Sequence, residues 1–399
     1  MPTFVIAGAS LAGAKAAETL RDEGFDGEIV LLGAEPELPY ERPPLSKGYL
    51  LGNEPLDVVY VHPADWYAEH GVDLRMGVTV TGIDRATSTV VTSDGALQYD
   101  RLLLTTGASP RRLNFPGSDR PEVLYLRTTA DSERLRAAFQ QGPRVVVAGA
   151  GWIGLETTAA ARSYGCPVTV LEPQPGALHE QLGPELGAVF ADLHRAHDVE
   201  FRFGERAAEF RPGLVITSTG AEVPADLLVV GIGAAPNDQL AAAAGLEVGN
   251  GVLTDEALRT SDENIFAAGD VANSFNPLLG RRVRVEHWAN ALNGGPAAAR
   301  SMLGQPVVYD PVPYFYSDQY DLGMECAGLP SPGSYDVVAY RGDRAAGEFI
   351  AFWLAANKVV AGMNVNVWDV NDDIQSLIRS ARQVDLSRLT NPDIPLPEV

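Results

Sequence analysis

Residues 145–173 read "VVVAGAGWIGLETTAAARSYGCPVTVLEP". The valine-rich start predicts a short buried parallel strand, the glycines predict a turn, and the alanine-rich stretch predicts a helix. The closing "PVTVLE" predicts a second strand that ends in Glu172. Strand, glycine turn, helix, strand and terminal acid in this order are typical of a βαβ unit that binds a dinucleotide.

The turn of this unit has all three glycines of the pattern G-x-G-x-x-G, namely Gly149, Gly151 and Gly154. The N-terminus of the helix would present its N–H groups and its positive dipole end to a diphosphate. Glu172 would accept hydrogen bonds from ribose hydroxyls and repel a 2′-phosphate, and no arginine follows it in "PQPGALHEQ". This turn is therefore expected to bind NADH in preference to NADPH.

The same pattern occurs earlier, because residues 4–35 read "FVIAGASLAGAKAAETLRDEGFDGEIVLLGAE". Gly8 allows the tight turn and Gly13 lets the helix lie close to the strand, whereas Ser10 replaces the middle glycine. Glu35 follows the second strand and can take ribose hydroxyls. Two units, each with strand, glycine turn, helix, second strand and terminal acid in order, predict two bound dinucleotides, one of which should be a flavin.

The bulk properties limit the classes of function. A chain of 399 residues is too long for one core, so two or three domains are expected. The net charge of −22 opposes binding to nucleic acid or an anionic membrane, and no apolar stretch could span a bilayer. The N-terminus is interpreted as a first strand rather than a signal peptide. With only two cysteines, a cytoplasmic location is the default expectation.

Residues 261–271, "SDENIFAAGDV", predict a strand, a tight glycine turn and Asp270 at the entry to a helix. Here the sequence resembles the flavoprotein reductases with two dinucleotide-binding domains. In that family such an aspartate binds the ribityl chain of FAD; the simpler interpretation of Asp270 is a helix N-cap. The stretches at 102–111, "LLLTTGASPR", and 227–237, "LLVVGIGAAPN", resemble the two crossings between the domains of that family.

Three further stretches narrow the resemblance: "PYERPPLSKGYLLG" at 39–52, "RVEHWANALNGG" at 284–295 and "YFYSDQYDLGMECAG" at 314–328. They are similar to the NADH-dependent ferredoxin reductases of the putidaredoxin reductase and biphenyl dioxygenase reductase type. The resemblance implies an α/β fold with two Rossmann-like dinucleotide-binding domains, for FAD and NAD, plus a small α+β C-terminal domain. The expected domains are an FAD domain of residues 1–110 and 240–308, an NAD domain of 111–239 and a C-terminal domain of 309–399. In the last of these, alternating apolar stretches predict a small antiparallel sheet with helices at its end.

The resemblance also assigns roles to individual residues. Lys47, in the "PPLSK" stretch, and Glu156, in the first turn of the second helix, would lie together beside the flavin N5. Trp288 would line the flavin and nicotinamide side, and Arg42 and Arg127 would reach the FAD adenosine or phosphate. The alternatives are a solvated lysine with a surface glutamate, a core tryptophan and surface arginines.

The implied FAD site consists of Gly8, Ser10, Leu11, Ala12, Gly13, Glu35, Arg42, Lys47, Val80, Thr106, Gly107, Arg127, Gly269, Asp270, Glu286, His287 and Trp288. The implied NAD site consists of Gly149, Gly151, Trp152, Ile153, Gly154, Glu156, Glu172, Gly231, Ile232 and Gly233. The catalytic residues implied are Lys47, Glu156 and Trp288.

Cysteine is absent from the first 165 residues, and Cys166 is expected to be a small buried hydrophobe. A redox thiol beside the flavin is therefore not expected, and the flavin would pass its electrons on directly. NADH delivers two electrons as hydride, whereas an iron–sulfur partner accepts one at a time. The resemblance thus implies transfer to a [2Fe-2S] ferredoxin that serves a cytochrome P450 or a dioxygenase.

Two minor patterns complete the predictions. His194 and His197 have no third ligand nearby, so they are interpreted as solvated helix histidines and no metal site is expected. The densest basic run, Arg281, Arg282 and Arg284, with Arg300 on the next helix, is either a ferredoxin docking edge or a solvated face.

Three functions remain open, with a monomer or weak homodimer expected in each. The first is NADH:ferredoxin reductase, and the second is NADH:rubredoxin reductase or NADH oxidase. The third is a non-enzymatic binding flavoprotein of the apoptosis-inducing-factor kind, which a basic surface and a targeting segment would favour.

Overall fold

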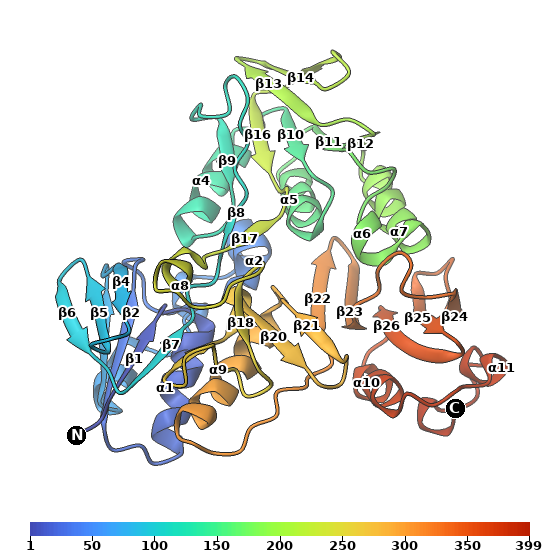
Figure 1. Ribbon diagram of the computed structural model, residues 1–399. Helices are drawn as coiled ribbons and strands as arrows, with labels where there is room; N and C mark the ends of the chain where they lie inside the picture. Colours follow the sequence, from blue (N-terminus) through green and yellow to red (C-terminus); the bar gives the residue numbers. More distant parts are fainter. The chain divides into compact units, whose positions relative to one another are not determined.

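The chain passes repeatedly between two units in the computed structural model, which describes all 399 residues (Figure 1). The first unit contains Met1–Arg42, Pro55–Ser109 and Ala234–Pro313, and the second contains Pro43–Glu54, Pro110–Gly233 and Tyr314–Val399. Residues 43–54 thus belong with the second unit, although the domain expected from the sequence included them in 1–110. One contact that holds them there is the 2.8 Å hydrogen bond that the Leu45 carbonyl accepts from Ser132 Oγ of the same unit.

The first unit is built on a five-stranded parallel sheet of order β19-β7-β1-β2-β3. Its strands are β1 (Thr3–Ala7), β2 (Glu28–Gly33), β3 (Val72–Met76), β7 (Arg101–Leu104) and β19 (Ile265–Ala267). Side chains alternate across β1, because successive residues of a strand point to opposite faces. Phe4 and Ile6 pack with the helices α1 (Leu11–Asp22) and α9 (Trp288–Met302). Val5 and Ala7 pack on the other face, which an antiparallel sheet covers.

That covering sheet has the order β4-β5-β6. Its strands are β4 (Val80–Asp84), β5 (Thr89–Thr92) and β6 (Gly95–Gln98). The remaining elements of this unit are η2 (Leu56–Val58), α3 (Ala64–Glu69), β17 (Ala234–Pro236), which pairs with β8 (Ala108–Pro110), α8 (Gln239–Ala243), β18 (Val252–Thr254), η3 (Gly269–Val271), β20 (Ala272–Asn276) and β21 (Arg281–Val283).

The second unit repeats this plan with a parallel sheet of order β12-β11-β10-β16-β9. Its strands are β9 (Val123–Tyr125), β10 (Val145–Ala148), β11 (Val168–Glu172), β12 (Val199–Phe203) and β16 (Leu227–Val230). Val146 and Ala148 pack against an antiparallel sheet of order β13-β14-β15. That sheet consists of β13 (Ala207–Arg211), β14 (Leu214–Thr217) and β15 (Glu222–Pro224). The helices and turns are η1 (Pro43–Ser46), α2 (Gly48–Leu51), α4 (Thr129–Phe139), α5 (Trp152–Ser163), α6 (His179–Leu182) and α7 (Pro184–Ala196).

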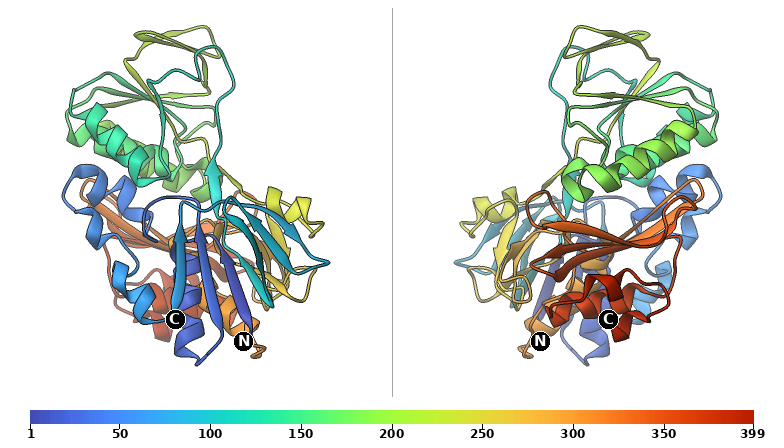
Figure 2. Two further views of the ribbon diagram at one scale, coloured as in Figure 1. Left: turned by 90° about the vertical axis from the view of Figure 1, so that its left-hand side faces the viewer. Right: turned by 90° about the vertical axis from the view of Figure 1, so that its right-hand side faces the viewer.

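The C-terminal part of this unit is a five-stranded antiparallel sheet of order β22-β23-β26-β25-β24. Its strands are β22 (Tyr314–Gln319), β23 (Leu322–Gly328), β24 (Val337–Asp343), β25 (Glu348–Ala355) and β26 (Lys358–Val365). The chain ends in α10 (Asn371–Ser380), α11 (Leu386–Leu389) and η4 (Leu396–Glu398), which lie on one side of the sheet (Figure 2). Both predicted βαβ units and the predicted C-terminal sheet are therefore confirmed.

The predicted helix at Asp270 is wrong. Gly269–Val271 form a single 3₁₀ turn, and the chain continues directly as β20. Residues 272–276 pair in parallel with β18 and in antiparallel fashion with β21, so ladder hydrogen bonds take the place of helical ones. No helix of the chain is both long enough and apolar enough to cross a bilayer.

Candidate functional site

The first glycine turn, between β1 and α1, has no room for a side chain at two positions. A Cβ atom at Gly8 would lie 2.2 Å from the Thr105 carbonyl oxygen, and Gly8 has a φ of +127°. A Cβ atom at Gly13 would lie 2.1 Å from the Gly8 carbonyl oxygen. Ser10 is the N-cap of α1 but its side chain makes no capping hydrogen bond, and the first turn contains no acidic residue. The first N–H groups of the helix therefore suit an anionic group such as a diphosphate.

Helix α9 also approaches this turn closely. A Cβ atom at Gly295 would lie 2.2 Å from the Ala12 carbonyl oxygen, and one at Gly269 would lie 3.3 Å from Ala12 Cβ. These glycines explain the "NGG" and "AGD" stretches of the sequence. They place Asp270 and the start of α1 together in the first unit.

Glu35 and Arg42, both predicted to contact FAD, form an ion pair next to the first turn. Arg42 Nη2 donates to Glu35 Oε1 at 2.7 Å, and Tyr40 OH donates to the other carboxylate oxygen. Arg42 Nη1 also donates to Tyr40 OH at 3.0 Å. Burial raises the pKa of Tyr40 above its ordinary value, so its hydroxyl stays a neutral donor. Sequence reasoning missed Tyr40, although it stands inside the "PYER" stretch.

The other predicted FAD residues of the first unit occupy the starts of elements and the crossings. Trp288 is the first residue of α9, and its Nε1 donates to Glu41 Oε2 at 3.1 Å. His287 is the N-cap of that helix, and Val80 begins β4. Glu286 pairs with Arg284.

The Thr106–Gly107 crossing is fastened to the chain that returns at residue 237. Thr106 Oγ1 donates to the Asn237 carbonyl at 2.8 Å, and Asn237 Nδ2 donates to the Thr106 carbonyl at 2.7 Å. The Asn237 N–H donates to the Gly107 carbonyl at 2.9 Å. Asn237 and Glu41 thus join the site as residues that sequence reasoning missed.

The second glycine turn, between β10 and α5, repeats the geometry of the first. A Cβ atom at Gly154 would lie 2.1 Å from the Gly149 carbonyl oxygen, and one at Gly149 would lie 2.4 Å from the Gly231 carbonyl oxygen. At Gly151, by contrast, a Cβ atom would meet nothing within 4 Å. No protein atom therefore requires glycine at 151, whereas a diphosphate lying against the backbone there would.

Glu172 ends β11 and holds the loop next to this turn. Its Oε2 accepts a hydrogen bond of 2.7 Å from the Ala150 N–H, and its Oε1 accepts one of 2.9 Å from the Gln174 N–H. The predicted ribose-binding carboxylate thus lies at the glycine turn. The other predicted NAD residues lie in α5 or the Gly231–Gly233 crossing. Ile153 and Ile232 are 43% and 38% exposed, so both offer apolar surface against which a planar ring could pack.

Lys47 and Glu156 form a buried ion pair within the second unit. Lys47 Nζ lies 2.8 Å from Glu156 Oε2, and the two side chains are only 17% and 4% exposed. Ser46 Oγ donates to the same carboxylate oxygen, and Ser317 Oγ donates to Glu156 Oε1 at 2.7 Å. The alternative of a solvated lysine with a surface glutamate is therefore wrong. Glu156 is the fifth residue of α5, one position beyond the first turn.

Two serines of this cluster escaped sequence reasoning. Ser46 adjoins Lys47 in the "PPLSK" stretch, and Ser317 comes from β22 of the C-terminal sheet. Lys47 Nζ also lies 5.5 Å from the centroid of the Tyr316 ring on that strand. Arg127, a predicted FAD residue, comes just before α4 in the second unit, and its backbone N–H donates to Asp131 Oδ2 at 3.1 Å.

Both thiols are inaccessible. Cys166 and Cys326 are free, and each is 0% exposed. Burial raises the pKa of both thiols, which keeps them protonated and unreactive. The prediction that Cys166 is a buried small hydrophobe is confirmed.

We therefore expect a disulfide reagent such as Ellman's reagent to leave the native protein unmodified. After unfolding, it should titrate both cysteines of the chain. Rapid modification of the native protein, accompanied by loss of electron transfer from NADH, would contradict this expectation.

The interpretation of His194 as a solvated histidine is wrong. His194 is 0% exposed, its Nε2 donates to Gln319 Oε1 at 2.8 Å, and its Nδ1 accepts from Tyr320 OH at 3.1 Å. The ring of His197 stacks on Tyr320, with 3.6 Å between the ring centroids. No group of three or more ligating side chains suited to a metal ion occurs in the structure.

Burial lowers the pKa of His194 to about 4 from the ordinary 6.5. Between those two pH values the unfolded chain binds a proton that the folded chain does not, so acid favours unfolding. A fall from pH 7 to pH 4 should remove about 3 kcal/mol of stability through this group. His194→Gln should lack this contribution in urea unfolding measured across that pH range. An unchanged pH dependence in the variant would reject the assignment.

Two of the four arginines of the predicted docking edge pair with carboxylates. The Arg284 side chain is 10% exposed and pairs with Glu286, and Arg300 Nε lies 2.8 Å from Glu23 Oε1. Arg282 Nη1 donates to the Thr254 carbonyl. Arg284 therefore does not belong to an exposed docking edge, and Arg281 and Arg282 are what remains of the predicted patch.

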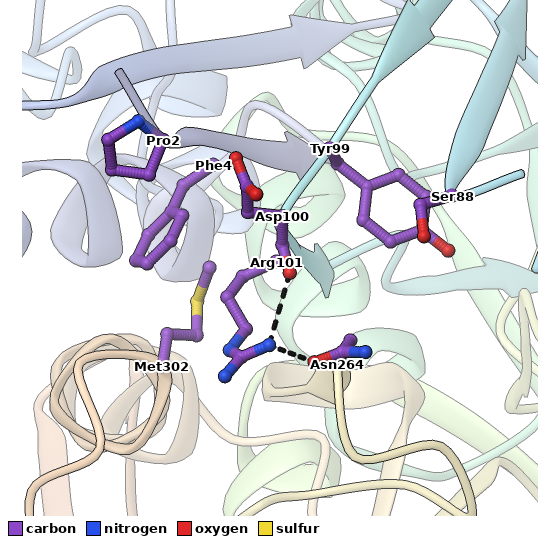
Figure 3. A pocket seen from close by; sticks show the side chains of 8 residues that line it. All are labelled: Pro2, Phe4, Ser88, Tyr99, Asp100, Arg101, Asn264 and Met302. Atoms are coloured by element: carbon purple, nitrogen blue, oxygen red, sulfur yellow. Dashed lines mark hydrogen bonds between the residues drawn. The ribbon is translucent and has the colours of Figure 1, made fainter.

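A pocket in the first unit lies away from the first glycine turn (Figure 3). Pro2, Arg101 and Asn264 line it, all at the amino ends of the strands β1, β7 and β19. Arg101 Nη1 donates to Asn264 Oδ1 and to the Asp100 carbonyl (Figure 3). Because the glycine turn follows the carboxyl end of β1, this pocket lies at the opposite edge of the sheet.

Comparison with known proteins agrees with this architecture. Residues 2–295 match the pyridine nucleotide-disulphide oxidoreductase family, and residues 314–399 match the reductase C-terminal domain family. The chain is 41% identical over 399 residues to the ferredoxin–NAD(+) reductase component of the anthranilate 1,2-dioxygenase system of Burkholderia cepacia, and the match covers 98% of each chain.

Two solved structures match the fold of this chain over its whole length. The reductase of the covalent putidaredoxin reductase–putidaredoxin complex has a TM-score of 0.95 at 36% identity, with 100% of this chain and 97% of the other covered. The ferredoxin reductase for the CYP199A2 system of Rhodopseudomonas palustris has a TM-score of 0.96 at 35% identity, with 100% and 99% covered. The chain therefore belongs to the pyridine nucleotide-disulphide oxidoreductase family, among the ferredoxin–NAD(+) reductases with a reductase C-terminal domain, which are flavoenzymes that use FAD and NADH.

Proposed function

We propose that this chain is an FAD-dependent NADH:ferredoxin reductase. It takes a hydride from NADH and passes single electrons to a [2Fe-2S] ferredoxin that feeds a cytochrome P450 or a ring-hydroxylating oxygenase. The observation that carries the proposal is the buried Lys47–Glu156 ion pair, because Glu156 stands on the helix that begins at the second glycine turn. A fixed pair of charges beside a nucleotide turn suits a reaction in which charge moves between two rings.

The residues present fit both cofactors. The first turn, with Gly8, Gly13 and the N-terminus of α1, would hold the FAD diphosphate, and Glu35 with Arg42 would hold its adenosine end. The second turn would hold NADH, with open space at Gly151 for the diphosphate and Glu172 for the ribose. Bound FAD supplies the conversion of one two-electron step into two one-electron steps.

The chain's own groups orient and balance this chemistry. One turnover consumes NADH and two oxidised ferredoxins and yields NAD⁺, two reduced ferredoxins and one proton. Lys47 supplies a positive charge held by Glu156, and the two serines keep the carboxylate in place. The inaccessible thiols support direct transfer to the ferredoxin without a sulfur intermediate.

The relatives support a ferredoxin as partner. One is the reductase component of a dioxygenase system, one was crystallised joined to putidaredoxin, and one is described as serving the CYP199A2 system. We extend these descriptions to this chain, together with a cytoplasmic location and a monomeric or weakly dimeric state. Light scattering on the purified protein across a concentration series tests the last of these.

The test of the proposed function is anaerobic reduction of a panel of [2Fe-2S] ferredoxins by NADH and catalytic amounts of the purified yellow protein. We expect rapid reduction of at least one ferredoxin, slower reaction with NADPH and little oxygen consumption without ferredoxin. Rapid oxygen consumption in the absence of ferredoxin would identify an oxidase instead, and selective rubredoxin reduction would identify a rubredoxin reductase. A protein that takes up no FAD would reject the proposal in every form.

A further inference from the structure

A series of hydrogen bonds runs from Tyr320, in the turn between β22 and β23, through His194 of helix α7 to the Lys47–Glu156 pair, entirely within the second unit. Tyr320 OH donates to His194 Nδ1 at 3.1 Å, and His194 Nε2 donates to Gln319 Oε1 at 2.8 Å. Gln319 Nε2 donates to Ser317 Oγ at 3.0 Å, and Ser317 Oγ donates to Glu156 Oε1 at 2.7 Å. Every donor in this chain points toward the carboxylate of Glu156.

The middle members of this hydrogen-bond series are almost completely shielded from water. Ser317 and Gln319 are each 1% exposed, and His194 is 0% exposed. Ser317 and Gln319 share one face of β22 because residues two apart in a strand point the same way. A buried polar group without a partner is costly, so each member holds the next in one orientation.

The orientations are determined by chemistry. His194 donates through Nε2 because the Gln319 carbonyl oxygen only accepts, and its Nδ1 then has to accept from Tyr320. Since the Ser317 hydroxyl oxygen accepts from the Gln319 amide, its proton is directed at Glu156. The lowered pKa of His194 keeps the ring neutral, as this arrangement requires.

This series of hydrogen bonds is suited to holding Glu156 in place and poorly suited to moving protons. An amide does not pass a proton without changing to its imidic acid form, and Gln319 lies in the middle of the route. Hydrogen bonds that all point one way polarise one another and strengthen the last bond, here the one to the carboxylate. The arrangement therefore acts on the position of Glu156.

We propose that Ser317, Gln319 and His194 are positioning residues that orient the Glu156 carboxylate, and through it Lys47, for hydride transfer from NADH. This inference rests on the proposed function, since it assigns the network to the NADH half of that reaction. The transfer of electrons to ferredoxin should not depend on it.

The test uses Ser317→Ala, Gln319→Leu and His194→Phe in the FAD-loaded full-length protein, mixed rapidly and anaerobically with NADH. We expect Ser317→Ala to slow flavin reduction about 10-fold, because it removes a hydrogen bond to a charged group, and the two more distant changes to slow it less. NADH deuterated at the transferred position should show a larger isotope effect in each variant. FAD content and electron transfer from the dithionite-reduced protein to ferredoxin should stay unchanged.

Two variants of α7 serve as controls. His194→Gln keeps a donor toward Gln319 and should recover most of the rate. His197→Phe keeps the stacking on Tyr320 but lies outside the hydrogen-bond chain, so it should reduce at the wild-type rate. Equal slowing by His197→Phe and His194→Phe would overturn the proposal, as would wild-type rates in Ser317→Ala.

A second readout does not depend on turnover. Nitrogen-15 spectra of the histidine-labelled protein should show His194 as the neutral Nε2–H tautomer at pH 7. The tautomer should lose this preference in Gln319→Leu. An Nδ1–H tautomer in the wild type would overturn the network. Failure of NADH to reduce the wild-type flavin would instead reject the proposed function, so the two failures are distinguishable.

Discussion

Gly13→Val is expected to give a folded protein that retains almost no FAD and is colourless after purification. The Cβ atom of the new side chain would lie 2.1 Å from the Gly8 carbonyl oxygen, which is much closer than van der Waals contact allows. Relief requires α1 to move away from β1, which carries the N–H groups of the helix away from the diphosphate. Overpacking of this kind costs about 3 kcal/mol, equivalent to about 100-fold in FAD affinity.

Gly151→Ala is the informative partner of this variant. A Cβ atom at 151 meets no protein atom within 4 Å, and the backbone there is extended, with φ of −80° and ψ of −178°. The variant should therefore keep its FAD and its unfolding midpoint. Its affinity for NADH should fall about 10-fold or more, because the added methyl group takes the space of the diphosphate.

The measurements are the ratio of flavin to protein absorbance, unfolding by urea, and NADH titration of the flavin-loaded protein. Gly13→Val should show a low ratio of flavin to protein absorbance. Gly151→Ala should differ from the wild type only in the NADH titration. Retention of FAD by Gly13→Val, or unaltered NADH binding by Gly151→Ala, would show that the two turns do not hold the two diphosphates.

These turns could be predicted from the sequence because their chemistry is local. Glycine is needed at 8, 13, 149 and 154 by backbone atoms a few residues away or on the adjacent strand, and the βαβ pattern supplies those neighbours. The open space next to Gly151 follows from the same motif. The prediction failed at residues 272–276, where a helix was expected: these residues pair with β18 and β21 and form β20.

The partners of Glu156 could not be predicted in the same way. Ser46 lies 110 residues away in the chain and Ser317 lies 161 residues away, so no local pattern records either contact. His194 did carry a usable signal. It follows Leu186 and Phe190 at intervals of four along α7, on the buried face of the helix, whereas its spacing to His197 directed attention to metal ligands.

Lys47→Met should retain FAD but slow the reduction of the flavin by NADH about 100-fold, comparable to the loss of one preorganised electrostatic group. Methionine preserves much of the length and volume of the side chain, so the change removes mainly the charge. The Glu156 carboxylate would keep its two serine donors but lose the cation 2.8 Å away. Its negative charge would then stand uncompensated in a buried place, where hydride arrival adds electron density.

Glu156→Gln separates the two halves of this pair. The amide keeps an acceptor for one serine and nearly the same shape, but Lys47 loses its counter-charge and the fixed position that the carboxylate gives it. We expect flavin reduction to slow in this variant as well. The double variant should be slowed by less than the product of the two single fold-changes, because both changes break the same interaction. Lys47→Arg, which keeps the charge but spreads it over a wider planar group, should lie between Lys47→Met and the wild type. Stopped-flow absorbance under anaerobic conditions measures all four rates. A Lys47→Met protein that binds FAD and is reduced as fast as the wild type would remove the pair from the reaction.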